Sequence, residues 1–222
     1  MNFFENEFKK LTEQEREDFY KTVFMNDYSE KGKEIRTKYY KQKFKNMGEN
    51  VVIGAGVKIV NPELISIGNG VKIGDGATII ARDDSEIIIG DNVTLKDRVY
   101  LDTERPGGYI HIDHDVYVGM GTTLHGHYGL EIGDNVLLAQ NITLTPYSHI
   151  FEDPNANIIT QGGHSKKVTI GRDAYVGMGV DIMYSGDIGE GSVIGAGSVV
   201  VKPIPPYSVA VGNPAKVIKK RQ

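Results

Sequence analysis

The chain has 222 residues, of which 40% are hydrophobic and 24% are charged, and its formal net charge is −4. These values are typical of a soluble folded protein, and they do not favour nucleic-acid binding. The absence of cysteine excludes a cysteine nucleophile, a cysteine-bound zinc ion and a disulfide framework. No apolar run reaches the length of a membrane span, and the start of the chain lacks the apolar region of a signal peptide. We therefore expect a cytoplasmic protein.

Residues 1–47 predict a small helical segment. Thr12 and Glu15 fit a capping box, in which the side chain of each residue bonds to the backbone amide of the other. We expect the first helix to begin at this box. A second helix is expected over residues 29–45, where aliphatic and aromatic residues fall near one stripe.

From Val51 onward, an aliphatic residue recurs every six positions and is usually followed by glycine. The pairs are Ile53-Gly54, Ile67-Gly68, Ile73-Gly74, Ile89-Gly90, Ile132-Gly133, Ile170-Gly171, Ile188-Gly189 and Ile194-Gly195. Neither a helix nor a plain strand has a six-residue period. The pattern is typical of a solenoid of short strands, in which each coil covers the apolar edge of its neighbour. We predict an all-β solenoid over residues 48–205 and a C-terminal tail over residues 206–222.

The six-residue step is interrupted by insertions, and two regular steps separate each insertion from the next. The longer steps are 59–67, 79–89, 101–112, 124–132 and 144–170. If three steps make one triangular coil, every insertion projects from the same corner. Successive insertions would then stack about 4.8 Å apart, because that is the spacing of paired strands. We call this predicted column of insertions the ridge.

The ridge is the expected place for chemistry because it brings polar residues of different coils together. Its polar residues are Arg82, Asp83, Asp84, Glu104, Arg105, His125, His127, Tyr128, His149, Glu152, Asp153 and His164. A histidine near carboxylates suits general-base catalysis at neutral pH. His149, in the insertion over residues 146–167, is the candidate base, and His127 on the adjacent coil is a candidate substrate contact. We interpret His111, His114 and His164 as structural or solvated.

Several motifs of the solenoid follow one another in a specific order. They are IGDNV, the long histidine-bearing insertion, IGRDAYVG, IGAGSVV and GNPAKVI. In this order, residues 50–218 resemble the hexapeptide-repeat acetyltransferases of the galactoside and maltose O-acetyltransferase kind. The segments FEDPN and QGG are closest to the surface-polysaccharide O-acetyltransferases. The resemblance implies a left-handed parallel β-helix, a homotrimer with active sites between subunits, and acetyl-CoA as the acyl donor.

The resemblance also implies roles for individual residues. The catalytic histidine of the family falls on His149, and Tyr117 matches an acceptor-binding tyrosine. Contacts to CoA are implied for Tyr175, Met178, Ala196, Lys202, Lys216 and Lys219. Tyr175 stands where tryptophan is usual. In the galactoside type, asparagine is usual at Gly119 and aspartate at His127, so a different acceptor pocket is expected here.

These observations predict transfer of an acetyl group to a hydroxyl of a sugar or of a surface-polysaccharide precursor, without a metal. His149 would take the acceptor proton and return it to the CoA thiolate, and backbone amides near Met178 would stabilise the oxyanion. Three alternatives stay open. They are an amino-sugar N-acetyltransferase, a zinc enzyme of the carbonic-anhydrase type with three histidine ligands, and a non-catalytic trimeric binding scaffold.

Overall fold

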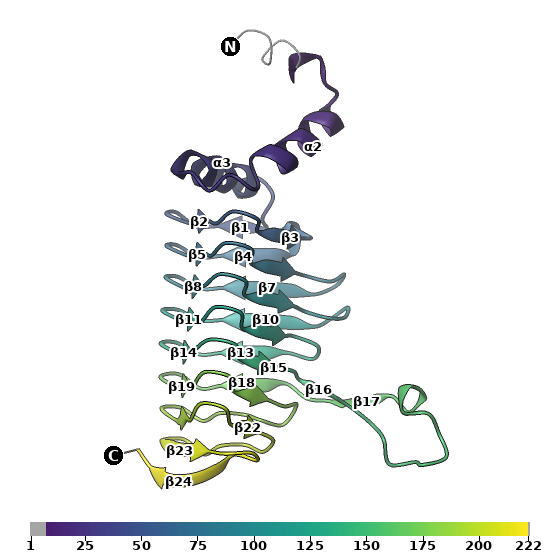
Figure 1. Ribbon diagram of the computed structural model, residues 1–222, viewed down its shortest axis with the longest axis vertical. Helices are drawn as coiled ribbons and strands as arrows, with labels where there is room; N and C mark the ends of the chain where they lie inside the picture. The colour runs from purple at the N-terminus through teal and green to yellow at the C-terminus, as the bar shows by residue number, and fades with distance from the viewer. Residues whose placement is uncertain (1–7, 222) are drawn as a thin grey trace.

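The computed structural model describes residues 8–221 as a three-sided prism with two helices across one end (Figure 1). The helices are α2 (Glu13–Val23) and α3 (Glu30–Lys41). Thr12 and Glu15 form the predicted capping box at the start of α2. Within residues 8–221, neither helix is long and apolar enough to cross a membrane.

The coils of the prism build three sheets, and most coils contribute one short strand to each of them. Sheet A contains β1 (Asn46–Met47), β4 (Ile65–Ile67), β7 (Glu86–Ile89), β10 (Tyr109–Ile112), β13 (Leu130–Ile132) and β18 (Val168–Ile170). Sheet B contains β2 (Val52–Ile53), β5 (Lys72–Ile73), β8 (Thr94–Leu95), β11 (Tyr117–Val118), β14 (Leu137–Leu138), β19 (Tyr175–Val176), β21 (Val193–Ile194), β23 (Ser208–Val211) and β24 (Lys216–Lys220). Sheet C contains β3 (Lys58–Val60), β6 (Thr78–Ile80), β9 (Tyr100–Asp102), β12 (Thr123–His125), β15 (Thr143–Leu144), β20 (Asp181–Ile182) and β22 (Val199–Val200).

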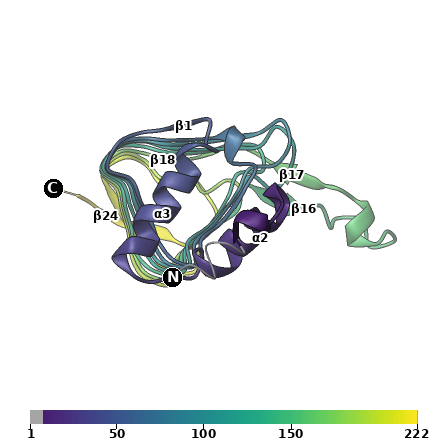
Figure 2. The same cartoon turned by 90° about the horizontal axis from the view of Figure 1, so that it is seen from above.

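Neighbouring coils pair in parallel, which confirms the predicted solenoid. Seen from the N-terminal end, the chain turns anticlockwise as it recedes, so the β-helix is left-handed (Figure 2). Two short 3₁₀ helices lie outside the sheets, at Pro62–Leu64 and Ile158–Thr160. A separate antiparallel hairpin is formed by β16 (Tyr147–His149) and β17 (Gly163–Ser165).

The core of the prism consists of the aliphatic residues of the six-residue repeat. On sheet B the inward side chains are at most 2% exposed, and they are Ile53, Ile73, Leu95, Val118, Leu138, Val176 and Ile194. Full burial of such a side chain contributes about 1.5–3 kcal/mol to folding. A glycine follows all of them except Leu95 and Leu138, and it permits close stacking at the corner. A Cβ atom at Gly177, for example, would lie 2.6 Å from the backbone nitrogen of Ala196 on the next coil.

Residues 206–222, which we expected to form a tail, contain two further strands of sheet B. Strand β23 runs parallel to β21, and β24 then folds back antiparallel along β23. Ser208 and Ala210 are fully buried, so the inward register continues past residue 205. The prolines at positions 203, 205 and 206 hide this continuation in the sequence, because they replace the usual residues of the repeat.

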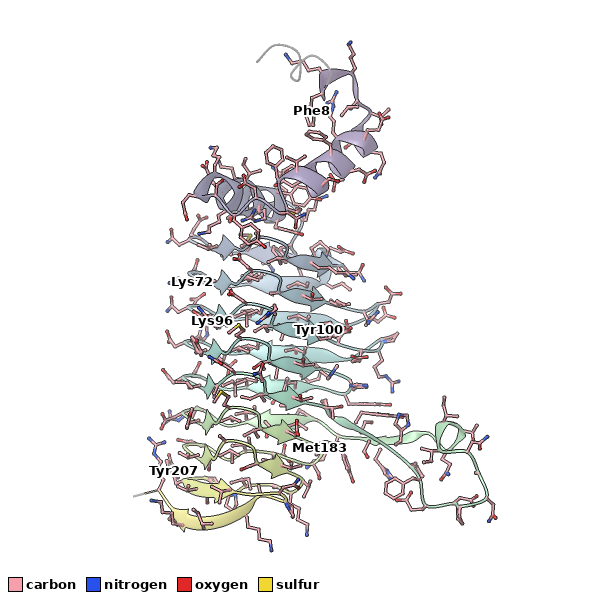
Figure 3. All side chains as sticks on the ribbon, in the orientation of Figure 1. Phe8, Lys72, Lys96, Tyr100, Met183 and Tyr207 are labelled. Atoms are coloured by element: carbon pink, nitrogen blue, oxygen red, sulfur yellow. The ribbon has the colours of Figure 1, made fainter. Side chains whose placement is uncertain are left out.

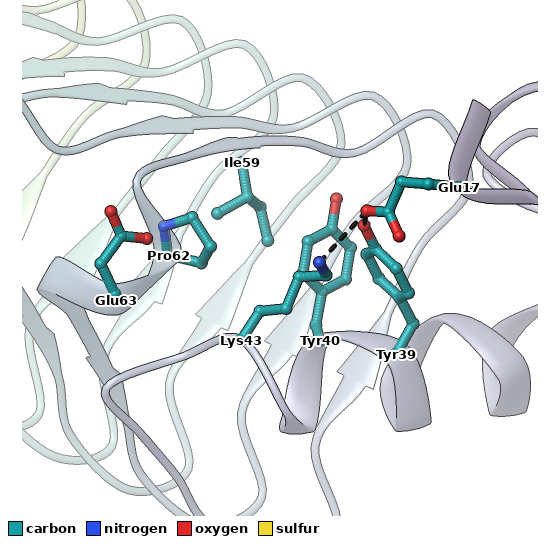
Figure 4. Close-up of a pocket in the computed structure, with 7 residues that line it drawn as sticks. All are labelled: Glu17, Tyr39, Tyr40, Lys43, Ile59, Pro62 and Glu63. Carbon is teal, nitrogen blue, oxygen red and sulfur yellow. Dashed lines mark hydrogen bonds and ion pairs between the residues drawn. The ribbon is translucent and has the colours of Figure 1, made fainter. Parts of the chain in front are cut away.

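The two helices cover the open N-terminal end of the apolar core, as a capping unit does in other solenoids. Met25, Tyr40 and Phe44 are buried in this contact. Figure 4 shows a shallow pocket beside it, where the Lys43 ammonium lies 3.1 Å from the Glu17 carboxylate. The pocket belongs to the first coil, whereas the long insertion leaves the fifth coil after β15.

Candidate functional site

The five insertions all lie at the corner where sheet C passes to sheet A, which confirms the ridge. They follow β3, β6, β9, β12 and β15, and the stacked loops share one corner in the view from above (Figure 2). Sheet B forms the side of the prism opposite this corner. A residue that points outward from sheet B therefore lies across the prism from the ridge of the same chain.

The longest insertion, residues 146–167, extends far from the prism, and we call it the arm (Figures 1 and 3). Its base is the hairpin of β16 and β17, in which His149 pairs with Gly163. Its tip is ordered by the side chain of Gln161, which accepts a hydrogen bond from the Asp153 amide at 3.1 Å and donates one to the Asp153 carbonyl oxygen at 2.9 Å. The arm is thus a defined structure that carries the candidate base outward.

Three rings follow one another from the ridge to the base of the arm. The His127 ring stacks on Tyr147, with centroids 5.1 Å apart and planes 11° apart. Tyr147 in turn meets His149 edge-to-face, at 5.0 Å and 89°. The His149 imidazole is exposed. The structure therefore brings together the two histidines that the sequence singled out on adjacent coils.

Further polar groups lie behind His127 on the ridge. The Nδ1 atom of His127 is buried and has no hydrogen-bond partner among the described residues. Burial lowers the pKa of His127, while the nearby Glu104 carboxylate raises it by less. The Nδ1 atom of His125 lies 2.5 Å from Oε1 of Glu104, an ion pair only when the imidazole is protonated. His127 is therefore a neutral imidazole with unused hydrogen-bonding capacity.

A fully buried carboxylate supports this part of the ridge. Asp102 accepts hydrogen bonds from Nε and Nη2 of Arg82, at 2.9 and 2.5 Å, and from the Tyr100 hydroxyl at 2.8 Å. Burial alone would raise the pKa of Asp102, but these hydrogen bonds and one from the Glu104 amide together hold it below its usual value. Sequence analysis missed Asp102, although its place next to inward Leu101 and before an insertion could have drawn attention to it.

Outward residues of sheet B form a second candidate surface. Tyr117, Leu137 and Tyr175 occupy the same register position on three consecutive coils. They are 40%, 44% and 43% exposed, so they make one apolar stripe on the surface. Tyr117 and His127, both expected to contact the acceptor, therefore lie on opposite sides of one chain. Lys72, which belongs to the same sheet, also lies across the prism from the arm (Figure 3).

The residues expected to contact CoA lie near the C-terminal end of sheet B and at its corner with sheet C. Met178 and Ala196 occupy this corner on consecutive coils, and the Gly197 amide donates a hydrogen bond to the Met178 carbonyl oxygen at 2.9 Å. Both side chains are exposed. Lys216 begins β24, next to Ala215, whose amide bonds to the carbonyl oxygen of Val199 in sheet C.

The remaining two lysines, Lys219 and Lys202, lie farther from that corner along their strands. Lys219 pairs with Val209 in the middle of the last two strands of sheet B. Lys202 follows β22, at the end of sheet C that faces away from the corner. All three lysines are exposed. In residues 8–221, no three or more histidine, aspartate or glutamate side chains are grouped so that they could hold a metal ion.

Comparison with known proteins places this geometry in context. The model of the "Hexapeptide repeat of succinyl-transferase" family matches residues 187–217. A probable acetyltransferase of Mycobacterium tuberculosis is 35% identical over 175 residues, which cover 78% of this chain and 50% of the relative. The galactoside O-acetyltransferase of Escherichia coli is 38% identical over 134 residues, which cover 60% and 63%. The chain carries a hexapeptide repeat and is similar in sequence to these acetyltransferases.

A solved structure shares the fold of this hexapeptide-repeat protein. It is AntD, an N-acyltransferase from Bacillus cereus in complex with dTDP and 3-hydroxybutyryl-CoA, with a TM-score of 0.59 and 23% identity. The likeness covers 89% of this chain and 91% of AntD. The chain spans between half and just under two thirds of the length of the two curated relatives described above.

Proposed function

We propose that this hexapeptide-repeat protein transfers an acetyl group from acetyl-CoA to a hydroxyl of a sugar or of a surface-polysaccharide precursor, in the cytoplasm. The observation that carries the proposal is the position of His149. Its exposed imidazole stands at the base of a long arm, on a ridge that gathers polar residues of several coils. The similarity to acetyltransferases over most of the chain supports the same reaction type.

The chemistry needs one base and an oxyanion site. The acceptor hydroxyl attacks the thioester carbonyl carbon while the His149 imidazole takes the hydroxyl proton. The tetrahedral intermediate carries a negative oxygen, which backbone N–H groups at the corner near Met178 would stabilise. Collapse of the intermediate breaks the C–S bond, and the imidazolium gives its proton to the departing thiolate. The acetyl ester and CoA leave without any covalent acyl-enzyme.

The site requires more than one copy of the chain. In a single protomer, His149 projects from the ridge, whereas Tyr117, Tyr175 and the Met178–Ala196 corner lie on or beside the opposite sheet. A cyclic assembly places the ridge of one copy beside sheet B of the next, and every copy then makes the same contact. The resemblance implies three copies. The exposed apolar stripe on sheet B supports such a contact, because large exposed apolar patches mark interaction surfaces.

CoA would lie along the corner of Met178 and Ala196. Both corner turns contain a glycine, Gly179 and Gly197, and nothing lies within 4 Å of where their Cβ atoms would be. An extended ligand could thus approach the backbone closely there. The exposed ammonium groups of Lys216, Lys219 and Lys202 suit the phosphates of CoA, and this part of the interaction should weaken with added salt.

The acceptor would bind between His127 of one copy and Tyr117 of the next. His127 offers a neutral imidazole, in place of the aspartate that is usual in the galactoside type. A neutral group favours an acceptor hydroxyl over a cationic amine, because it supplies no negative charge to pair with an ammonium. The Glu104 carboxylate lies against Nδ1 of His125, at 2.5 Å.

The proposal is tested by measuring thiol release from acetyl-CoA with a panel of sugars and matched amino sugars. We expect turnover with hydroxyl acceptors and none without an acceptor. Turnover confined to amino sugars would replace the proposal with N-acetylation. A protein that neither binds acetyl-CoA in calorimetry nor releases thiol with any acceptor would be a scaffold rather than this enzyme.

A further inference from the structure

Tyr147 stands between the two histidines of the candidate site. Residues 147 and 149 are two positions apart in strand β16, so their side chains point to the same side of the strand. The Tyr147 ring is stacked on His127 on one side and meets His149 edge-to-face on another. It is thus the physical link between the body of the ridge and the base of the arm.

The Tyr147 ring is held from the opposite strand of the hairpin as well. Gly163 lies across from His149 in the antiparallel pair, and any Cβ atom there would overlap the Tyr147 ring. The requirement for glycine at position 163 is therefore steric, because the ring occupies the space of the missing side chain. The ring cannot turn toward β17 and is confined between Gly163 and the His127 imidazole.

His149 itself has few restraints. Its side chain is exposed, and no residue among 8–221 makes a hydrogen bond to its imidazole. The edge-to-face contact with Tyr147 is its one ring contact within the described part of the chain. A general base must lie within about 2.6–3.2 Å of the proton that it removes, and a displacement of about 1 Å can lower a rate on the order of 100-fold.

We propose that Tyr147 is the positioning residue of the general base: its ring, fixed by Gly163 and His127, holds the His149 imidazole in the orientation that accepts the acceptor proton. This proposal rests on the proposed function of His149. The role belongs to the ring rather than to the hydroxyl, because both contacts to the histidines are made by the ring.

The first test compares Tyr147→Phe with Tyr147→Leu in the full-length protein. The phenylalanine variant keeps the ring and should retain kcat within about twofold. The leucine variant should lose about 10- to 100-fold in kcat with little change in KM for acetyl-CoA, because the base is present but misplaced. Equal losses in both variants would overturn the proposal, since the hydroxyl would then act directly.

A double variant separates positioning from a general loss of structure. Once His149 is alanine there is no imidazole to orient, so adding Tyr147→Leu should cause no further loss in kcat. A further loss equal to that of the single variant would refute the positioning role. If His149→Ala alone leaves kcat unchanged, the proposed function fails. If His149→Ala is inactive but Tyr147→Leu is fully active, only the present inference fails.

A third variant disturbs the ring without changing it. Gly163→Ala should lower kcat as Tyr147→Leu does, because the new methyl group must displace the Tyr147 ring. Gly162→Asn is the matched control. Position 162 has a φ of +80°, which asparagine tolerates better than most residues. A Cβ atom at this position would have nothing within 4 Å of it. Equal activity of Gly163→Ala and the wild type, with folding verified by thermal unfolding, would argue against the confinement of the ring.

Discussion

Arg36 in α3 donates a hydrogen bond from its Nε atom to the Ile53 carbonyl oxygen at 3.1 Å. This bond gives a partner to a carbonyl at the N-terminal edge of the first coil. Between coils, hydrogen bonds run in both directions: the Gly54 amide donates to the Ile73 carbonyl oxygen of the next coil at 2.8 Å, and the Gly76 amide donates back to the Ala55 carbonyl oxygen at 2.7 Å. Ile53 holds the position of Ile73 in the first coil, where no earlier coil supplies an amide to its carbonyl. The same guanidinium also donates to the Phe24 carbonyl oxygen at the end of α2, at 2.8 Å.

Arg36→Ala should therefore destabilise the N-terminal cap. The substitution leaves the buried Ile53 carbonyl without this donor and takes one of two donors from the Phe24 carbonyl, and loss of such charge-assisted bonds costs about 3 kcal/mol. Thermal unfolding and hydrogen exchange of the first coil are the measurements. Lys33→Ala, which removes an exposed ion pair with Glu30 in the same helix, is the control and should change stability by less than about 0.5 kcal/mol. Equal exchange protection in the two variants would contradict the capping role.

The buried carboxylate of Asp102 predicts a pH dependence of stability. Its pKa is lower in the folded chain than in the unfolded chain, so the ionised form stabilises the fold at neutral pH, and this contribution is lost as the pH falls through the lowered pKa. Asp102→Asn should lower the melting temperature at pH 7. The difference from the wild type should shrink below about pH 4, the ordinary value for aspartate.

The matched control for Asp102→Asn is Asp83→Asn on the same ridge. Asp83 is exposed and makes no ion pair or hydrogen bond with any residue in the described part of the chain. Its variant should melt with the wild type at every pH. A difference between wild type and Asp102→Asn that stays constant down to pH 2 would show that the charge of Asp102 plays no part in its stabilising role.

Sequence periodicity predicted the solenoid and the ridge because both depend on local rules. An inward aliphatic residue every six positions fixes the coil, and the positions of Ile67, Ile89 and Ile112 after insertions fix the corner. The ring contacts of Tyr147 could not be predicted in this way. They depend on how a 22-residue insertion over residues 146–167 folds back on itself, and no repeat constrains that segment. The last strands were hidden for a related reason, since prolines interrupt the repeat before Ser208.

His149→Ala should lower kcat by about 10²–10⁴, the usual contribution of a positioned acid–base group. Acetyl-CoA affinity should change little, because the imidazole acts on the acceptor proton. His164→Ala, a histidine on the other strand of the same hairpin, is the control and should remain active. Near-normal turnover of His149→Ala would disprove the mechanism.

His127→Ala should mainly raise KM for the acceptor, because the neutral imidazole is expected to bond to an acceptor hydroxyl. Burial lowers the pKa of His127, so the imidazole stays neutral below the ordinary histidine value of about 6.5. Acceptor KM should accordingly be flat from pH 8 to about 6.5 and rise only at lower pH. Steady-state kinetics across this range provide the measurement. An unchanged KM in His127→Ala with every competent acceptor would remove His127 from the site.

The shared site predicts that two inactive variants can restore activity to each other. His149→Ala damages the ridge, whereas the double variant Tyr117→Ala, Tyr175→Ala damages sheet B. The ridge and sheet B lie on opposite sides of one chain, so each site takes its ridge from one protomer and its sheet B from another. No single protomer therefore needs both surfaces to be intact. In randomly mixed trimers made by co-expression, a site is intact when both of its halves come from undamaged surfaces. Each half is undamaged with a probability of one half, so about a quarter of the wild-type kcat should return.

Light scattering should confirm trimers in each sample. Two variants that are inactive separately and remain inactive in mixed trimers would show that each site lies within one chain, and the intersubunit arrangement proposed here would be wrong.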